Sequence, residues 1–474
     1  MIALVIFLSG SVLTAASTTM AWLILARALA GLGAAGLISV TQIITASVGP
    51  PHERGRYMGI LGAVFGLSTT IGPLVGGMMA DRLTWRISFY INVPLICFTM
   101  ISILLLVRPE TRQHQSFSEK LGRVDFFGAL MLVTGLMLLL LGLNWGGRVY
   151  PWVSPVVIIC ISVGLLLLCV FVFVEGKLVL EPIIDARILR YRNVALSILT
   201  EMCVGAVFFN TTFNLPVYYS FTQNSSASES GVRMVPLACG VVAASMVSGW
   251  LIAMFSVYRL VACAGAAIMT LGAGLMCLFD AHISTGAQVP ILILLGSGIG
   301  CCIQALLLTA QATVRSADLA MTTALVTFSQ MIGGIMGLAF GSIVSESSTK
   351  HYLDRLIDMS PKYATDIIKA QNDANEVWSM NIPNGIQQSI IVAYAKGLQN
   401  SFILITCLSA MAIVFAACLQ NVSQHKPPPT VETPPERGTH DRRFDHYHMN
   451  NPSGYPRNGL DLNRTDQDVA TLAW

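Results

Sequence analysis

Long apolar stretches recur along this chain and restrict its fold more than any other feature of the sequence. Twelve stretches approach the ~20 residues that a helix needs to cross the ~30 Å hydrocarbon core of a bilayer. Inside lipid every backbone N–H and C=O must be paired within the protein, so each stretch is predicted to form a helix. Charged residues make up only 11% of the sequence, whereas soluble domains carry about a quarter. We therefore predict an all-α polytopic membrane protein.

The predicted spans are residues 2–17, 20–47, 56–80, 87–107, 125–143, 153–174, 193–220, 231–255, 258–279, 288–310, 320–345 and 399–419.

The stretch from Gly59 to Asp81 combines membrane length with many small residues. At helical spacing these residues leave a groove nearly free of side chains, against which a neighbouring helix can pack closely. A leucine in place of Gly76 or Gly77 is expected to push the packed helices apart and abolish function. The groove consists of Gly62, Gly66, Ser68, Gly72, Pro73, Gly76 and Gly77.

This pattern resembles the antiporter motif of the major facilitator superfamily. Five residues match the motif, and Ser68 stands where the motif has a further glycine; the matching residues are Gly59, Gly72, Pro73, Gly76 and Gly77. The flanking sequences ERGRYMGILGAVFGL and LTWRISFYINVPL are similar to those of the fungal 14-helix drug:proton antiporters. The resemblance implies secondary active transport by alternating access, with proton-coupled efflux of hydrophobic drugs, toxins or secondary metabolites. The alternatives are an importer or uniporter of another solute and a non-transporting, truncated membrane protein.

The resemblance also implies a domain organisation. Residues 1–107 would be the remainder of the N-terminal helix bundle, and residues 108–192 an inserted helix pair with flanking cytosolic loops. Residues 193–419 would be a C-terminal six-helix bundle containing a long outer loop at 347–398, followed by a disordered cytosolic tail at 420–474. In the family the antiporter motif lies on the fifth helix, whereas here it lies on the third predicted span. We therefore expect two further helices upstream, giving fourteen.

The distribution of basic residues predicts the orientation of the chain. Short loops assigned to the cytosol carry most of the arginines and lysines, among them Arg190 and Arg315, which places the C-terminal tail in the cytosol. Asn224 begins the glycosylation sequon Asn224-Ser225-Ser226 and falls on the outer side, where it is either glycosylated or too close to the bilayer. The expected location is the plasma membrane, with the vacuolar membrane as the alternative.

Two ionisable residues lie at membrane depth within predicted spans, where a charge costs at least ~2.5 kcal/mol and marks a functional hypothesis. Arg27 matches an arginine that takes part in proton coupling in the family; the alternative is a structural cation paired with a carbonyl or reaching the interface. Glu201 lies about eight residues into its span, near mid-membrane, and is a second candidate for proton coupling. Its alternative is a permanently protonated or hydrogen-bonded structural residue.

Five amide side chains within the spans are candidates for lining a substrate cavity. For each of them the alternative is a helix–helix hydrogen bond or a lipid contact. These candidates are Asn210, Asn214, Gln304, Gln311 and Gln330.

The sequence contains no Walker sequence GxxxxGK[ST], no His/Cys cluster of metal-site spacing and no clustered basic surface. We therefore expect a transporter rather than an enzyme, with no catalytic residues, metal or cofactor and no nucleic-acid partner. The expected partners are a small-molecule substrate, protons and the lipid bilayer, and the expected state is a monomer.

Overall fold

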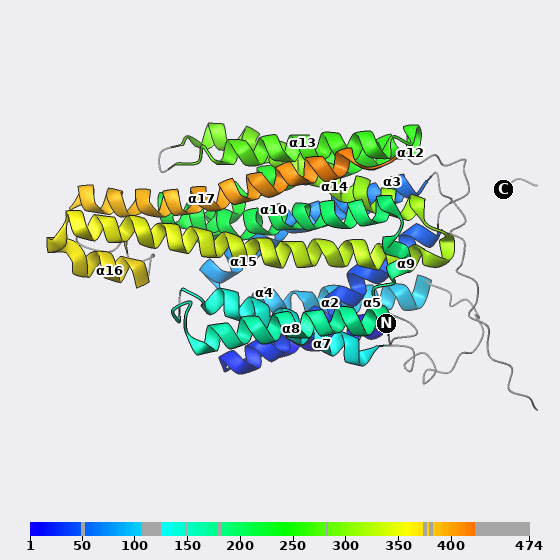
Figure 1. Cartoon of the computed structure of the whole chain (residues 1–474), viewed down its shortest axis with the longest axis horizontal. Coiled ribbons are helices and arrows are strands. Elements are labelled where there is room, and N and C mark those ends of the chain that lie inside the picture. Colours follow the sequence, from blue (N-terminus) through cyan, green and yellow to red (C-terminus); the bar gives the residue numbers. More distant parts are fainter. Residues whose placement is uncertain are drawn as a thin grey trace, which may run out of the picture. The chain divides into compact units, whose positions relative to one another are not determined.

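The structure is a computed structural model that describes residues 1–48, 53–106, 125–147, 149–177, 183–280, 283–372, 377–378 and 383–421. The described residues form helices and no strand (Figure 1). The loop at 108–124 and the predicted tail from residue 422 onward lie outside the described residues.

The first third of the chain forms α1 (Ile2–Ala15), α2 (Met20–Val48), α3 (Arg54–Arg82), α4 (Ile87–Tyr90) and α5 (Asn92–Leu106). The middle forms α7 (Phe126–Trp145), α8 (Pro155–Lys177) and the short α9 (Ala186–Leu189). The remainder forms α10 (Arg192–Gln223), α11 (Ala227–Arg233), α12 (Val235–Phe255), α13 (Tyr258–Met276), α14 (Thr285–Thr313), α15 (Leu319–Met359), α16 (Ala364–Asn372) and α17 (Asn384–Ala417).

Within the described residues, eleven helical segments are long and apolar enough to cross a membrane, which confirms the all-α polytopic prediction. This number is one fewer than the twelve predicted spans, and the difference is α1. This helix has 14 residues, or ~21 Å at 1.5 Å per residue, and is shorter than the hydrocarbon core. Each of the other predicted spans corresponds to one helical segment. One of these segments consists of α4 and α5, and another consists of α11 and α12.

Helices α10, α12, α13, α14, α15 and α17 pack against one another and hold the main hydrophobic core. Its largest fully buried side chains include Tyr218, Tyr219, Phe279 and Phe402. Near the N-terminus, α1 packs against α2, α4 and α5. Helix α3 crosses between the two groups, since it packs along α11 and α12 and also contacts α14. Helix α2 contacts α15 among the later helices.

The segment predicted as a long outer loop, residues 347–398, is largely helical among its described residues. Helix α15 has 41 residues and α17 has 34, or ~60 Å and ~50 Å, so both exceed the thickness of a bilayer. Their extensions and α16 run past the ends of the neighbouring helices in Figure 1. A separate hydrophobic cluster holds them together; its buried members include Leu353, Ile367, Ile390 and Ile391. We call this unit, residues 347–398, the helical extension.

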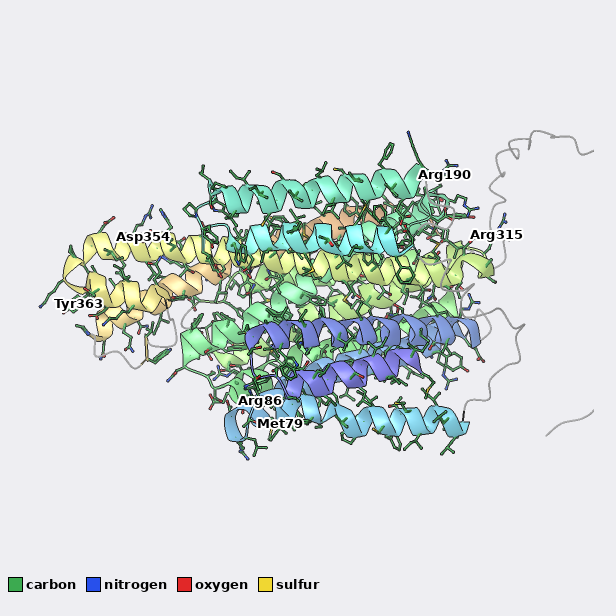
Figure 2. All side chains as sticks on the ribbon, turned by 90° about the horizontal axis from the view of Figure 1, so that it is seen from below. Met79, Arg86, Arg190, Arg315, Asp354 and Tyr363 are labelled. Carbon is green, nitrogen blue, oxygen red and sulfur yellow. The ribbon has the colours of Figure 1, made fainter. Side chains whose placement is uncertain are left out.

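The two ends of the bundle carry different labelled residues in Figure 2. Arg190 and Arg315 lie at one end, and Asp354 and Tyr363 of the helical extension lie at the other. This matches the sidedness predicted from the basic loops, in which Arg190 and Arg315 share one side of the membrane.

Candidate functional site: the α3 seam and the buried polar groups of the bundle

Helix α3 is packed against α12 through glycines, as its small-residue groove predicts. A Cβ atom built on Gly55 would lie 2.6 Å from the carbonyl oxygen of Gly249, and one on Gly59 would lie 3.3 Å from that of Ser245. One built on Gly62 would collide with the Gln304 side chain of α14. Any side chain at Gly55 or Gly62 would therefore force the helices apart. We call this contact of α3 with α11, α12 and α14 the α3 seam.

The residues of the antiporter motif divide between two faces of α3. Gly59 and Gly77 lie in the seam, and a Cβ on Gly77 would lie 2.7 Å from the Ala227 carbonyl oxygen. A Cβ on Gly72 or Gly76 would meet no atom within 4 Å. The sequence-based expectation treated Gly76 and Gly77 alike, and the structure separates them because they point in different directions from the helix axis.

Two further motif residues have defined surroundings. Ser68 is exposed, and its hydroxyl donates to the Val64 carbonyl oxygen of its own helix at 2.8 Å. The carbonyl oxygen of Pro73 lies against Gly231 of α11, 2.9 Å from the position of a Cβ there. The serine that replaces the motif glycine is thus outside the seam, whereas the proline is part of it.

Polar contacts join α3 and α2 to the later helices. At the end of α3, the Asp81 carboxylate accepts hydrogen bonds from the backbone N–H of Ser228, at 3.0 Å, and from the Ser228 hydroxyl. Ser228 lies in the first turn of α11, whose N-terminus is closed by a capping box between Ser226 and Glu229. Elsewhere, Thr327 of α15 donates to Gln42 of α2 at 2.6 Å. The seam is therefore fastened by side-chain hydrogen bonds in addition to glycine packing.

Glu201 is the most deeply buried carboxyl group among the described residues, with 2% of its surface exposed. It lies in α10, which packs against α14, α15 and α17. Its Oε2 atom is buried and has no hydrogen-bond partner among the described residues. Since an unpartnered polar atom is costly in an apolar interior, its retention here points to a role other than packing.

Arg27, the other candidate for proton coupling, has a different environment. Its side chain is exposed on α2, and its guanidinium lies 5.3 Å from the centre of the Phe89 ring in α4. This is a cation–π contact within the first group of helices. The structure therefore does not bring Arg27 and Glu201 together in one site.

Asn210 and Asn214 take part in a hydrogen-bond network between helices. Asn210 donates to the Gly337 carbonyl of α15 and to the Ser401 hydroxyl of α17, each at 3.2 Å. Asn214 donates to the Asn210 side-chain oxygen at 3.2 Å. The two asparagines thus make the helix–helix hydrogen bonds of the alternative interpretation, and their part in a substrate cavity stays a prediction.

The three glutamines are all buried, and each retains one atom without a hydrogen-bond partner among the described residues. Gln311 donates to Thr323 at 2.9 Å but leaves its oxygen free. Gln304, whose side-chain nitrogen lies against Gly62, leaves its oxygen free, and Gln330 leaves its side-chain nitrogen free. Hence Gln304, Gln311 and Gln330, unlike the two asparagines, have spare hydrogen-bonding capacity inside the bundle.

A small cavity lies where α3 meets α10 and α12, and none of the five amide candidates lines it. Thr69 of α3 and Thr212 of α10 provide its hydroxyl groups, and Phe208 forms part of its apolar wall. Sequence reasoning missed both threonines. Thr69 is within the small-residue stretch, but nothing in the sequence tells which face of α3 it occupies. The remaining lining residues are Met234, Leu237, Ala238 and Val241.

Asn224 ends α10 and has an exposed side chain. Its backbone is left-handed, with φ 50° and ψ 36°, a conformation that asparagine tolerates better than most residues. The sequon thus lies on a surface turn. Its modification stays a prediction.

Comparisons with known proteins identify the family of this chain. It is 29% identical over 437 residues to an MFS-type transporter of Claviceps purpurea (strain 20.1), covering 90% of this chain and 74% of that protein. It is 28% identical over 418 residues to the aspyridones efflux protein of Neocamarosporium betae, covering 87% of this chain and 73% of that protein. The efflux pump roqT of Penicillium rubens (strain ATCC 28089 / DSM 1075 / NRRL 1951 / Wisconsin 54-1255) is 28% identical over 427 residues, covering 90% and 78%.

Solved structures show the same fold at low sequence identity. A bacterial homolog of the human lysosomal transporter Spinster, in an inward-facing and occupied conformation, has a TM-score of 0.51 at 16% identity and covers 90% of this chain and 83% of that one. The human organic anion transporter MFSD10 (TETRAN) has a TM-score of 0.52 at 12% identity, and the match covers 88% of this chain and 75% of that one. The sequence profile of the Major Facilitator Superfamily matches residues 1–338. This chain, a multi-pass membrane protein, belongs to the Major Facilitator Superfamily.

Proposed function

We propose that this transporter exports small hydrophobic molecules and that inward proton movement drives the export. The export direction and substrate class are supported by the names of the fungal relatives, two of which are efflux proteins. The proton coupling is supported by one observation, the burial of Glu201 with an unpartnered carboxyl oxygen in the core of the later helices. The proposed location is the plasma membrane and the proposed state is a monomer.

Glu201 is the proposed carrier of the coupled proton. A bound proton removes the charge of this buried carboxylate, and release of the proton restores that charge. Each protonation state therefore favours a different surrounding, one apolar and one open to water. Arg27 has no comparable support, because its exposed guanidinium already has the Phe89 ring as a partner.

The α3 seam is the proposed surface on which the two groups of helices move relative to each other during alternating access. Glycines bring the backbones into contact without interlocking side chains, so a small rotation disrupts few specific contacts. The polar contacts Asp81–Ser228 and Gln42–Thr327 are exchangeable with water and are the proposed fastenings of the closed arrangement. The cavity that includes Thr69 and Thr212 lies on this seam and is the proposed start of the substrate path.

Transport by Glu201→Gln in proteoliposomes tests the coupling. The amide keeps the shape of the carboxyl group but cannot titrate, so we expect export that no longer responds to an imposed pH gradient. The initial rate of export of a fluorescent hydrophobic substrate, with and without the gradient, is the measurement.

Glu175→Gln is a matched control, because Glu175 is a second buried glutamate with an unpartnered oxygen but lies in α8, away from the α3 seam. This control should retain gradient-driven export. Normal gradient dependence in Glu201→Gln would move the coupling to another residue. Gradient-independent transport by the wild type would indicate a uniporter.

A further inference from the structure

Helices α7 and α8 pack on each other through glycines spaced seven residues apart. A Cβ on Gly142 would lie 2.6 Å from Ile161, and one on Gly135 would lie 3.1 Å from Leu168. Continued by seven residues in each helix, this antiparallel register places Gly128 opposite residue 175. That residue is Glu175, whereas the residues opposite Gly142 and Gly135, Ile161 and Leu168, are both aliphatic.

Glu175 meets a second carboxyl group at this position. Asp125 precedes α7, and its Oδ1 atom accepts from the Gly128 N–H at 2.8 Å as the helix cap. A Cβ on Gly128 would touch the other oxygen of Asp125, Oδ2, and would lie 3.2 Å from Glu175 Oε1. The two carboxyl groups are therefore neighbours above the same glycine.

Neither carboxyl group is fully partnered. Glu175 has only 7% of its surface exposed, and its Oε1 accepts from the Ile183 N–H at 3.1 Å. Glu175 Oε2 and Asp125 Oδ2 are buried and have no hydrogen-bond partner among the described residues. Two adjacent acceptors can satisfy each other only if one of them carries a proton.

Among the described residues, the charged groups on the surrounding elements do not neutralise this pair. Lys177 of α8 lies over the Phe173 ring at 5.1 Å, and Arg187 of α9 is paired with Asp185 at 2.8 Å. Helix α7 itself carries no charged residue. Helix α15, which packs against α7, has none from Leu319 to Ser345.

We propose that Asp125 and Glu175 form a proton-binding site that holds one shared proton and closes this end of the α7–α8 pair. Loss of the shared proton leaves two adjacent negative charges, one of them on the buried Glu175. The separated carboxyl groups of the unfolded chain have released their protons at neutral pH. The native state thus binds more protons, and its stability falls as the pH rises.

The test uses the full-length protein in detergent, with the unfolding temperature measured from about pH 6 to about pH 9. We expect the wild type to lose several degrees across this range. Glu175→Gln and Asp125→Asn should each lose much less, because an amide donates permanently to the remaining carboxylate, and asparagine still caps α7. Asp354→Asn, an exposed change in the helical extension, should retain the wild-type profile.

Infrared spectroscopy of the wild type gives a second readout that does not depend on how the variants fold. A carboxylic-acid C=O band that is present at neutral pH and lost at alkaline pH should be weaker in Glu175→Gln than in the wild type, and Glu201→Gln identifies any part of the band that belongs to Glu201. Identical pH profiles for the wild type and both amide variants would overturn the proposal, as would bands of equal intensity in the wild type and Glu175→Gln. Stabilisation of the alkaline wild type by sodium or calcium ions, lost in Glu175→Gln, would show a metal-ion site instead. Neither readout depends on transport.

Discussion

At the scale of single residues, the same residue type serves different purposes according to the helix face it occupies. Gly77 lies in the α3 seam and Gly76 faces open space among the described residues. We predict that Gly77→Leu costs about 1–3 kcal/mol of stability through overpacking and abolishes export. Gly76→Leu is its matched control. This variant should reach the membrane in normal amounts and retain most export activity. The measurement is the export rate of each variant, normalised to the amount of folded protein. Equal losses of export rate in both variants would contradict the proposed difference between the two faces of α3.

The buried amides show why residue roles could not be predicted from the sequence. Asn210 and Asn214 carry the same amide group as the glutamines, and which partners that group meets depends on the rotation of each helix within the bundle. Glu175 falls one residue beyond its predicted span and was therefore not recognised as buried. The repeat of Gly128, Gly135 and Gly142 at seven-residue intervals was a signal that could have revealed its packing. The burial of Glu201, by contrast, followed from its depth in an apolar span.

At the scale of elements, the contact between the end of α3 and the start of α11 is testable. We predict that Asp81→Ala opens the bundle on this side, because Ser228 loses its acceptor. Thr69 lines the cavity where α3 meets α10 and α12. In a background without other reactive cysteines, Thr69→Cys should react with a membrane-impermeant thiol reagent a few-fold faster when Asp81→Ala is present than when it is absent. Ser228→Ala should raise the rate less, because the backbone N–H of residue 228 still donates to Asp81, and adding it to Asp81→Ala should change the rate little. An unchanged rate would show that Asp81 does not hold the seam closed.

The lengths of the elements were only partly predictable. Hydropathy located the membrane portions of α15 and α17 but ended them where polar residues begin. Beyond Ser345 the apolar residues Tyr352, Leu353, Leu356 and Ile357 recur at helical spacing, which is a signal for an amphipathic helix outside the membrane. Because this helix buries its apolar face against α16 and α17, the helical extension needs no lipid.

At the scale of the whole molecule, the all-α membrane fold followed from the apolar stretches, because lipid leaves the backbone few alternatives. The sidedness is a separate prediction. In a background without other reactive cysteines, Asn224→Cys and Asp354→Cys should react with an impermeant reagent in intact cells. Arg315→Cys, at the opposite end in Figure 2, should react only after permeabilisation. The reverse pattern would invert the proposed topology.

The length of α15 has a mechanical consequence. From Gly333 to Met359 the helix is continuous and spans ~40 Å, so the helical extension acts as a lever attached to the later helices. The helical extension is also tied to α10, since the Trp378 indole donates to the Phe221 carbonyl at 3.2 Å. A tilt of ~10° about the level of Gly333 would displace the tip by ~7 Å, given the rise per residue of an α-helix. Rotations that are too small to detect near the membrane centre are thus magnified at Met359, where a spectroscopic label would follow the transport cycle in real time.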